Sequence, residues 1–328
     1  MEGNVVRNFC TLFDRNYLYK GAVMLRSLAK HDPGARTFVV CLDHITLSVL
    51  TRLSIPGVQT IELREVESDE VLRVKPVRSV AEYCWTLTSV VMWHVMQENP
   101  DIDLLTYLDA DLMFFSSVEP IFIEMGNASI LAVEHRYPRE KQHFEMYGRF
   151  NVQWVSFRRD QAGMSCLARW RTQCLEWCYA RIEGGKHGDQ KYLDSWPSDY
   201  GDAFHSLQNV GAGLAPWNYA NYKLQVRDGR YWVDDSQVIF YHFHQFQILD
   251  SGGFSPFRTQ YFEGRPPPHA LYEHYWSELR GMIEAVRQID PDFDSGTKAV
   301  ALVRLRLIAS RFLPTGLKNV LKRVGFRA

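Results

Sequence analysis

LLTYLDADLMFF, residues 104–115, places two carboxylates, Asp109 and Asp111, inside an otherwise apolar run. A polar stretch at 99–103 precedes the run, so we expect a buried strand of a parallel sheet. Because side chains alternate along an extended chain, both aspartates point the same way where the strand runs out into a loop. An unpaired carboxylate in apolar surroundings is costly. The pair therefore favours a divalent metal, which takes hard oxygen ligands, over a purely structural role.

The same Asp-x-Asp spacing occurs at two other places, residues 101–103 and residues 290–294. Both lie in polar stretches that contain a proline, Pro100 in one and Pro291 in the other, which is typical of solvated loops or turns. Spacing alone does not separate the three matches, whereas the apolar context of residues 109–111 does.

Length and composition indicate a globular protein. The chain has 328 residues, 46% of them hydrophobic, which suffices for one large α/β domain with appendages or for two modest domains. Lys and Arg number 37 against 38 Asp and Glu, so the balance gives no argument for a nucleic-acid partner. The first residues lack the pattern of a signal peptide and no uncharged stretch is long enough for a membrane span, so we expect a cytoplasmic location.

The six cysteines include no Cys-x-x-Cys pair, so neither a zinc knuckle nor a disulfide framework is indicated. Cys174 and Cys178 are four residues apart on an expected helix. We interpret them as part of an apolar, core-facing stripe rather than as metal ligands.

Strand-like and helix-like segments alternate along the chain with short connections, which predicts a parallel sheet covered by helices on both faces. The expected strands are 5–13, 37–42, 58–63, 129–134, 150–157 and 238–244, and the main expected helices are 46–53, 79–97, 161–182 and 270–289, with a further helix ending at 31–34. No Gly-x-x-x-x-Gly-Lys-Ser/Thr is present, and no Gly-x-Gly-x-x-Gly follows the first strand. A phosphate group would therefore have to be held by a metal.

Several polar segments are expected to meet at one cleft. Asp14 and the 109/111 pair follow strand ends, where ligands bind in such sheets. Loops at 183–190, 209–213 and 215–219 mix glycine with Trp, Asn and Asp, which suits a sugar or nucleotide pocket. The alternative for each loop is a packed surface segment.

His242 and His244 lie in the apolar stretch 238–244, and alternation puts them on the same face. One or both could therefore reach a metal held by the aspartates. The alternative is a buried histidine satisfied by a backbone carbonyl.

The C-terminal stretch from Ser295 onward contains no acidic residue. Its basic residues are Lys298, Arg304, Arg306, Arg311, Lys318, Lys322, Arg323 and Arg327. Leu317, Val320, Leu321 and Val324 share one helical face, so this part could lie on an anionic membrane surface. The alternative is a helix that docks on its own domain or on a dimer partner.

Six short motifs follow one another along the chain. They are Asp14-Arg15-Asn16-Tyr17, Tyr107-Leu108-Asp109-Ala110-Asp111, Phe150-Asn151, Asp189-Gln190, Trp217-Asn218 and Tyr241-His242. In this order the chain resembles nucleotide-sugar glycosyltransferases of the GT-A fold, most of all glycosyltransferase family 8 and its bacterial relatives, over residues 9–246. The resemblance implies an α/β, Rossmann-like GT-A fold whose mostly parallel sheet is flanked by helices. We expect a catalytic domain at 1–250, a connector and packing helix at 251–294, and a helical basic extension at 295–328.

The resemblance also implies roles for individual residues. Mn²⁺ or Mg²⁺ would be held against the donor diphosphate by Asp109, Asp111 and His242. The nucleotide would be bound by Thr11, Asp14, Asn16, Tyr17, Asp109, Trp217 and Asn218, with Tyr17 stacking on the base. The catalytic residues around the donor sugar would be Asn151, Asp189 and Gln190.

Two departures from the family 8 pattern concern phosphate binding. A glycine and a Lys-Pro-Trp usually follow the metal-binding histidine, whereas this chain continues Phe243-His244-Gln245-Phe246. The phosphate-binding lysine thus has no evident equivalent. The arginine usual before the metal motif is not evident either, and Arg78 or Lys75 is the candidate substitute.

The resulting expectation is a glycosyltransferase that moves a hexose from a UDP-sugar to a glycan or lipid-linked acceptor, with retention, in bacterial surface polysaccharide synthesis at the inner membrane face. The alternatives are a non-catalytic carbohydrate- or sugar-nucleotide-binding protein on this fold, and a sugar-1-phosphate nucleotidyltransferase. The latter places a glycine-rich loop after the first strand, where this chain has Leu12-Phe13-Asp14-Arg15.

Overall fold

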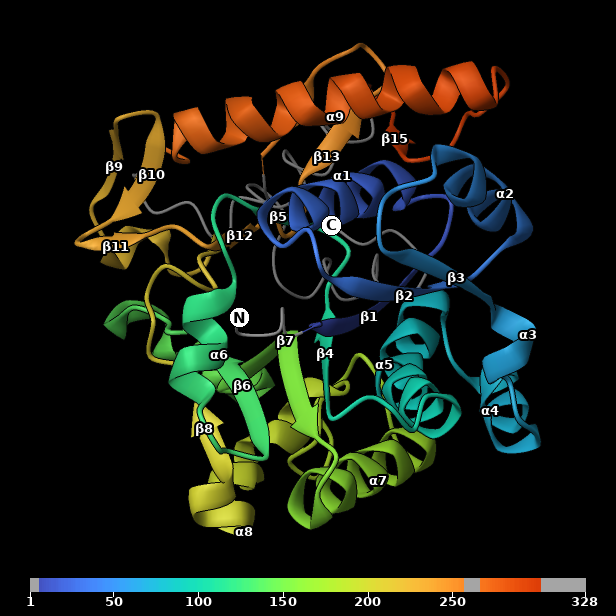
Figure 1. Cartoon of the computed structure of the whole chain (residues 1–328), viewed down its shortest axis with the longest axis vertical. Coiled ribbons are helices and arrows are strands. Elements are labelled where there is room, and N and C mark those ends of the chain that lie inside the picture. The colour runs from blue at the N-terminus through green and yellow to red at the C-terminus, as the bar shows by residue number, and fades with distance from the viewer. Residues whose placement is uncertain (1–5, 257–265, 302–328) are drawn as a thin grey trace, which may run out of the picture.

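The computed structural model describes residues 6–256 and 266–301 and is built around a seven-stranded sheet (Figure 1). Its strand order is β3-β2-β1-β4-β7-β6-β8. The strands are β1 (Asn8–Phe13), β2 (Arg36–Cys41), β3 (Val58–Glu62), β4 (Leu104–Leu108), β6 (Ile130–Glu134), β7 (Phe150–Arg158) and β8 (Phe204–Ser206). Only β7 in this sheet runs antiparallel to its neighbours, so the predicted mostly parallel α/β sheet is confirmed.

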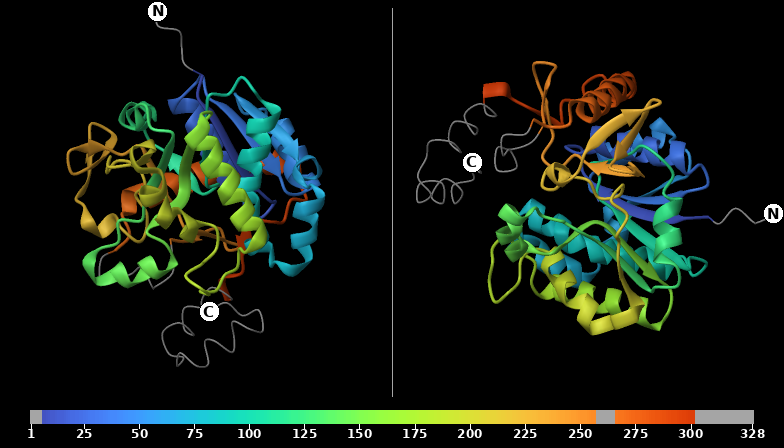
Figure 2. Two further views of the ribbon diagram at one scale, coloured as in Figure 1. Left: turned by 90° about the horizontal axis from the view of Figure 1, so that it is seen from below. Right: turned by 90° about the vertical axis from the view of Figure 1, so that its left-hand side faces the viewer.

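Helices cover both faces of the sheet, as Figures 1 and 2 show. On one face lie α1 (Leu18–His31) and α2 (His44–Leu53), and α9 (His269–Ile289) packs on these two from outside. On the other face lie α5 (Val80–Glu98) and α7 (Gln161–Glu176). The shorter helices are α3 (Leu63–Val66), α4 (Asp69–Val74), α6 (Glu119–Met125) and α8 (Trp196–Tyr200).

Alternation along the strands divides the core into two clusters. In β2, Val39 belongs to the cluster under α1 and α9, whereas Phe38 and Val40 belong to the cluster under α5 and α7. Burying both faces of a sheet in this way requires the near-continuous apolar runs that the sequence shows. The sheet is consequently a fixed platform for the polar residues that follow its strand ends.

The strand predicted in the run at 104–115 ends before the two aspartates, as expected, but the run then continues into a second strand that was not predicted. The chain leaves the main sheet after β4, turns at residues 109–111, and enters β5 (Leu112–Phe114). There it pairs antiparallel with β12 (Phe240–His242), with Leu112 opposite His242. This pairing satisfies the backbone of the apolar segment and brings Asp111 next to His242.

Two small sheets complete the described chain. One consists of β9 (Leu224–Arg227), β10 (Arg230–Val233) and β11 (Ser236–Gln237), and the other of β13 (Gln247–Leu249), β14 (Phe254–Ser255) and β15 (Thr297–Lys298). The second sheet ties the chain that follows α9 back onto the body of the protein.

Some predicted bounds differ from the structure. The helix expected over 161–182 ends at Glu176, so Cys178 lies beyond it, although Cys174 and Cys178 are both fully buried. β12 is shorter than expected because the backbone turns at Gln245, which has a positive φ of 63°. The division of the chain at residues 250 and 294 stays a prediction, and basic residues 304–327 lie outside the described residues.

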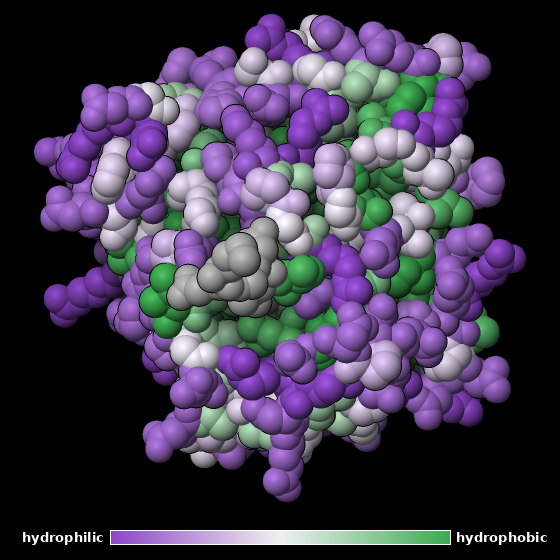
Figure 3. All heavy atoms as spheres, viewed as in Figure 1, coloured by the Kyte–Doolittle hydropathy of each residue, from purple (hydrophilic) through white to green (hydrophobic). Residues whose placement is uncertain are grey.

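The face in view in Figure 3 is mainly hydrophilic, with hydrophobic residues mostly in hollows between polar ones. Among the described helices, none has the length and apolar character needed to cross a membrane.

Candidate active site

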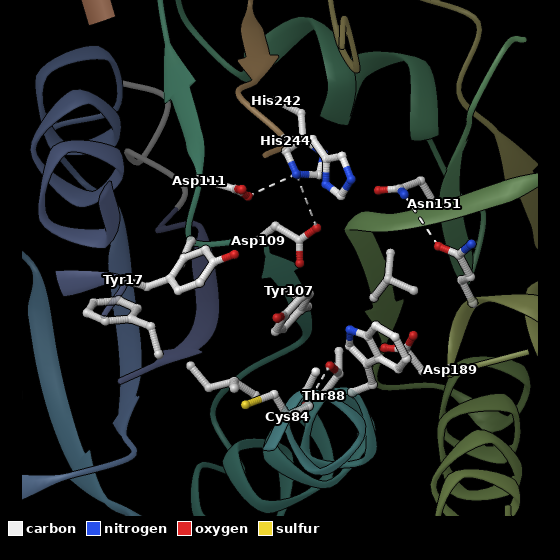
Figure 4. A pocket seen from close by; sticks show the side chains of 18 of the residues that line it. Tyr17, Cys84, Thr88, Tyr107, Asp109, Asp111, Asn151, Asp189, His242 and His244 are labelled. Atoms are coloured by element: carbon white, nitrogen blue, oxygen red, sulfur yellow. Dashed lines mark hydrogen bonds and ion pairs between the residues drawn. The ribbon is translucent and has the colours of Figure 1, made fainter. Parts of the chain in front are cut away.

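A cavity of about 860 Å³ opens where β1 and β4 end (Figure 4). Residues from the β1–α1 turn, the first turns of α5, the 109–111 turn and the start of β7 line it, together with loop residues around 135–147, 187–190 and 242–244. The predicted cleft at the carboxyl ends of the strands is thus present, and its volume suits a ligand larger than a single sugar ring.

Asp111 and His242 form the most buried polar corner of the cavity. The Asp111 Oδ1 lies 2.9 Å from the His242 Nε2, and the Asp109 Oδ2 lies 3.7 Å from the same nitrogen. His242 donates from Nδ1 to the Gln153 Oε1 at 3.1 Å, which directs Nε2 toward the two aspartates. The sequence prediction that Asp109, Asp111 and His242 converge therefore agrees with the geometry, which Figure 4 shows.

The pKa values of Asp111, His242 and Asp109 are shifted in different directions in this corner. Burial opposes ionisation of Asp111, but the neighbouring His242 outweighs it and holds the pKa of Asp111 well below its usual range. Burial likewise opposes a charge on His242, yet Asp111 raises the pKa of that imidazole. Burial raises the pKa of Asp109 to about 6, and its side chain keeps 30% exposure. Asp109 is therefore the carboxylate that a ligand in the cavity reaches first.

His244 adds a further ligand atom. Atoms of Asp111, His242 and His244 all lie within 4.8 Å of one another. Burial and the neighbouring His242 lower the pKa of His244 to about 3, so its imidazole is neutral and can donate a lone pair. Adjacent ligands of an octahedral ion are ~3 Å apart when the metal–ligand bonds are about 2.1 Å, which the Asp111–His242 separation matches. A mixed set of carboxylate and imidazole ligands suits a divalent cation.

A hydrogen-bonded group of amides lines the opposite wall. The Asn151 Nδ2 donates to the His135 Nε2 at 3.0 Å and lies 3.4 Å from the Gln190 Oε1. The Gln190 Nε2 donates to the Tyr147 carbonyl at 2.9 Å, which fixes the orientation of that side chain. Asp189 is 6% exposed, and burial together with Asp109 raises its pKa to about 7. This wall offers hydroxyl-binding groups rather than metal ligands.

The β1–α1 turn forms a third side. Asp14 accepts hydrogen bonds from the backbone and the side-chain nitrogen of Asn16, at 3.0 and 2.8 Å. Tyr17 is 42% exposed as a residue, and the Lys20 ammonium lies 4.6 Å from the centroid of its ring. An exposed aromatic face at a cavity wall can stack on a planar ring.

The chain has relatives along nearly its whole length. No model of a known protein family matches it. It is 31% identical over 292 residues to "Uncharacterized protein YfnD" of Bacillus subtilis (strain 168), which covers 88% of this chain and 94% of that protein. It is 30% identical over 294 residues to "Uncharacterized protein YfnF" of the same organism, which covers 87% and 96%. The chain belongs to the family of YfnD and YfnF.

A solved structure of an active-site mutant of the galactosyltransferase LgtC shows which fold this chain adopts. It matches with a TM-score of 0.50 at 15% identity, over 84% of this chain and 95% of that chain. The likeness confirms the GT-A fold that the sequence predicted for this member of the YfnD and YfnF family.

Two residues that the sequence assigned to the nucleotide do not line the cavity. Asn218 is fully buried and uses its side chain to accept from the Ala215 backbone and to donate to the carbonyls of His135 and Gly213. Thr11 is fully buried inside β1. Both therefore lie in the framework of the cavity in this family member.

The other predicted residues line the cavity, but the proposed arginine substitute does not. The residues that do so are Asp14, Asn16, Tyr17, Asn151, Asp189, Gln190 and Trp217, together with Asp109, Asp111 and His242. Arg78 donates to the Leu175 carbonyl and lies 3.8 Å from the Tyr179 ring, and Lys75 pairs with Glu67. Neither is placed to meet a phosphate.

Sequence reasoning missed three residues of the site: His135, Gln153 and Lys298. His135 directly follows β6, so the rule that singled out Asp14 would have found it. Gln153 lies inside the buried strand β7 and resembles any core polar residue in the sequence. Lys298 lies far along the chain in a stretch expected to bind membranes, and no local signal marks it.

Proposed function

We propose that this protein is a metal-dependent glycosyltransferase that moves a hexose from a UDP-sugar to a glycan or lipid-linked acceptor. The observation that carries the proposal is the Asp111–His242 corner facing the Asn151 and Gln190 amides across one cavity. The GT-A fold and the resemblance to glycosyltransferase family 8 support it. A carboxylate–imidazole corner suits a cation, and the amide wall suits hydroxyl groups.

Asp109, Asp111 and His242 would hold the ion, with His244 as the neutral fourth candidate. When bound, a divalent ion neutralises negative charge that develops on a departing diphosphate. Gln153 keeps the Nε2 of His242 turned toward the aspartates, so the ligand geometry is set before any substrate arrives.

Gln190, Asp189 and Asn151 would contact the donor sugar. Because the Gln190 amide nitrogen is bonded to Tyr147, its carbonyl oxygen is the atom turned to Asn151 and the cavity. A fixed carbonyl dipole stabilises positive charge that develops at an anomeric carbon. Asp189 and Asn151 would accept and donate hydrogen bonds to sugar hydroxyls. We propose retention of the anomeric configuration on the family resemblance.

The base and ribose would occupy the β1–α1 side. Tyr17 presents its ring to a pyrimidine, and Asp14 with Asn16 offers a carboxylate and an amide already bonded to one another. Trp217 lines the cavity beside His242, and the two rings meet edge-on with centroids 5.2 Å apart.

The test is turnover by the full-length protein with a panel of UDP-sugars, each with Mn²⁺ and with EDTA. We expect Mn²⁺-dependent release of UDP from one donor, and NMR of the product should show the anomer retained. UDP binding without release from any donor, with or without acceptor mixtures, would favour the non-catalytic alternative. Absence of metal-dependent UDP binding would overturn the proposal.

We place the reaction in bacterial surface polysaccharide synthesis, at the inner face of the cytoplasmic membrane, with the basic segment as the anchor. Deleting residues 302–328 should move the protein from the membrane to the soluble fraction without loss of folding. A full-length protein that is already soluble in cell fractions would contradict the anchor.

A further inference from the structure

The chain that follows α9 is fixed against the first helix. Phe293 is buried, and its ring meets that of Tyr19 edge-on with centroids 5.2 Å apart. Gly296 has a φ of +82°, and a Cβ there would lie only 3.0 Å from the Tyr19 ring and 3.4 Å from the Asn16 carbonyl oxygen. Only glycine tolerates both the conformation and the close approach. Residues 293–296 are thereby held beside the β1–α1 turn.

The next residues are tied to the second small sheet. β15 pairs with β13 so that Lys298 lies opposite Leu249. Asp250 donates its backbone N–H to the Lys298 carbonyl at 3.1 Å and accepts from the Val300 N–H through its carboxylate at 3.2 Å. The backbone of Lys298 is therefore held in place on both sides, and its position does not depend on a ligand.

This fixed strand brings Lys298 to the cavity. Among the described residues that line it, Lys298 is the only lysine or arginine, whereas Asp14, Asp109, Asp111 and Asp189 contribute carboxylates. Within the described chain, no ion pair or side-chain hydrogen bond engages the Lys298 ammonium. Lys298 therefore brings a positive charge into a cavity that is lined by four carboxylates.

From this placement we infer that Lys298 binds the diphosphate of the sugar-nucleotide donor, in the cavity that Asp109 and Asp111 also line. The inference rests on the proposed function. It adds to the donor site a positively charged side chain, Lys298, that lies outside residues 9–246, the range of the family resemblance. A diphosphate at this cavity would otherwise meet four carboxylates. The Lys298 ammonium, on the fixed strand β15, can pair with a phosphate oxygen, as the ammonium groups of other phosphate-binding lysines do.

The experiment measures UDP and uridine affinities of the full chain in Mn²⁺ by calorimetry and ligand-observed NMR. Lys298→Met removes the charge and keeps most of the stem, and it should weaken UDP binding about 10- to 100-fold. Uridine, which lacks phosphate, should bind as it does to the wild type. Lys298→Arg should recover most of the UDP affinity.

Lys30→Met is the matched control, because Lys30 is exposed on α1 and does not line the cavity. It should leave both affinities unchanged. UDP affinity equal to wild type in Lys298→Met would overturn the inference alone, and so would an equal loss for uridine. A wild type that binds no UDP with Mn²⁺ would overturn the proposed function and this inference together.

Discussion

The corner formed by Asp111 and His242 and the opposite wall of the cavity are built in different ways. Asp111 and His242 meet because β5 and β12 pair with Leu112 opposite His242, inside the apolar core. Across the cavity, Asn151 lies in β7, and its side chain and that of Gln190 are oriented by hydrogen bonds that end on the Tyr147 carbonyl. Strand register sets the corner, whereas a polar network sets the wall.

The difference separates two kinds of substitution. A substitution in the corner removes a proposed metal ligand that strand pairing holds in place. No neighbouring side chain can then move into its position. A change in the wall alters charge or orientation in a network that can readjust. We therefore expect the largest effects in the corner and the smallest in the wall.

Replacing Asp111 by Asn should have the largest effect. The variant keeps size and shape but loses the charge that pairs with His242 at 2.9 Å. We expect a loss of at least about 10³-fold in turnover, because a metal contributes several kcal/mol to a transition state of this kind. Metal-dependent UDP binding, followed by calorimetry, should disappear as well.

Asp103→Asn is the matched control for that change. Asp103 belongs to the other Asp-x-Asp pair beside β4 and is exposed, and it does not line the cavity. Its replacement should leave turnover and UDP binding within about twofold of wild type, as surface substitutions usually do. Equal losses in the two variants would mean that the corner has no special role.

Gln153→Leu tests whether the pairing of β5 with β12 is enough to keep His242 oriented toward Asp109 and Asp111. Without the Gln153 acceptor, the His242 Nδ1 loses its 3.1 Å partner and the ring can rotate. We expect Mn²⁺ affinity to fall about 10- to 100-fold, the usual effect of losing a group that orients a metal ligand. Gln153→Glu, which keeps an acceptor, should bind Mn²⁺ more tightly than Gln153→Leu. Mn²⁺ affinity equal to wild type in both variants would show that the strand register alone orients His242.

The Asp111–His242 corner could be predicted from the sequence because its charged and polar residues stand inside apolar runs, where such residues are unusual. A carboxylate pair in an apolar run and two histidines in another are visible without knowing the fold, and alternation gives their shared direction. The same reasoning predicted the sheet and its covering helices, since strand and helix periodicities differ. What it missed was the second strand at Leu112–Phe114, because an apolar run does not show that a new strand begins after the turn.

The rest of the site depends on contacts between segments distant in the chain. Gln153 meets His242 across 89 positions, and Lys298 reaches the cavity only because β15 pairs with β13. Asn218 was assigned to the nucleotide through the family resemblance, whereas its amide is fully used by backbone groups. No local pattern distinguishes an amide that binds a ligand from one that holds a loop, so these assignments need the tertiary structure.

Asp189→Asn tests the charge of the opposite wall and should have the smallest effect. The pKa of Asp189 is about 7 in the folded protein, raised by burial and by Asp109, against about 3.9 in an unfolded chain. Between these values the native state holds a proton that the unfolded state has lost, so this group makes stability fall as pH rises toward 7.

The Asn variant lacks this titration but keeps a carbonyl acceptor. In EDTA, urea denaturation should show similar stability for wild type and variant near pH 4. At pH 8 the variant should be more stable by about 1–3 kcal/mol, since one pKa unit corresponds to about 1.4 kcal/mol and a buried site relaxes in part. A difference that stays constant from pH 4 to pH 8 would show that Asp189 is ionised throughout, and the wall would then carry a full negative charge toward the donor sugar.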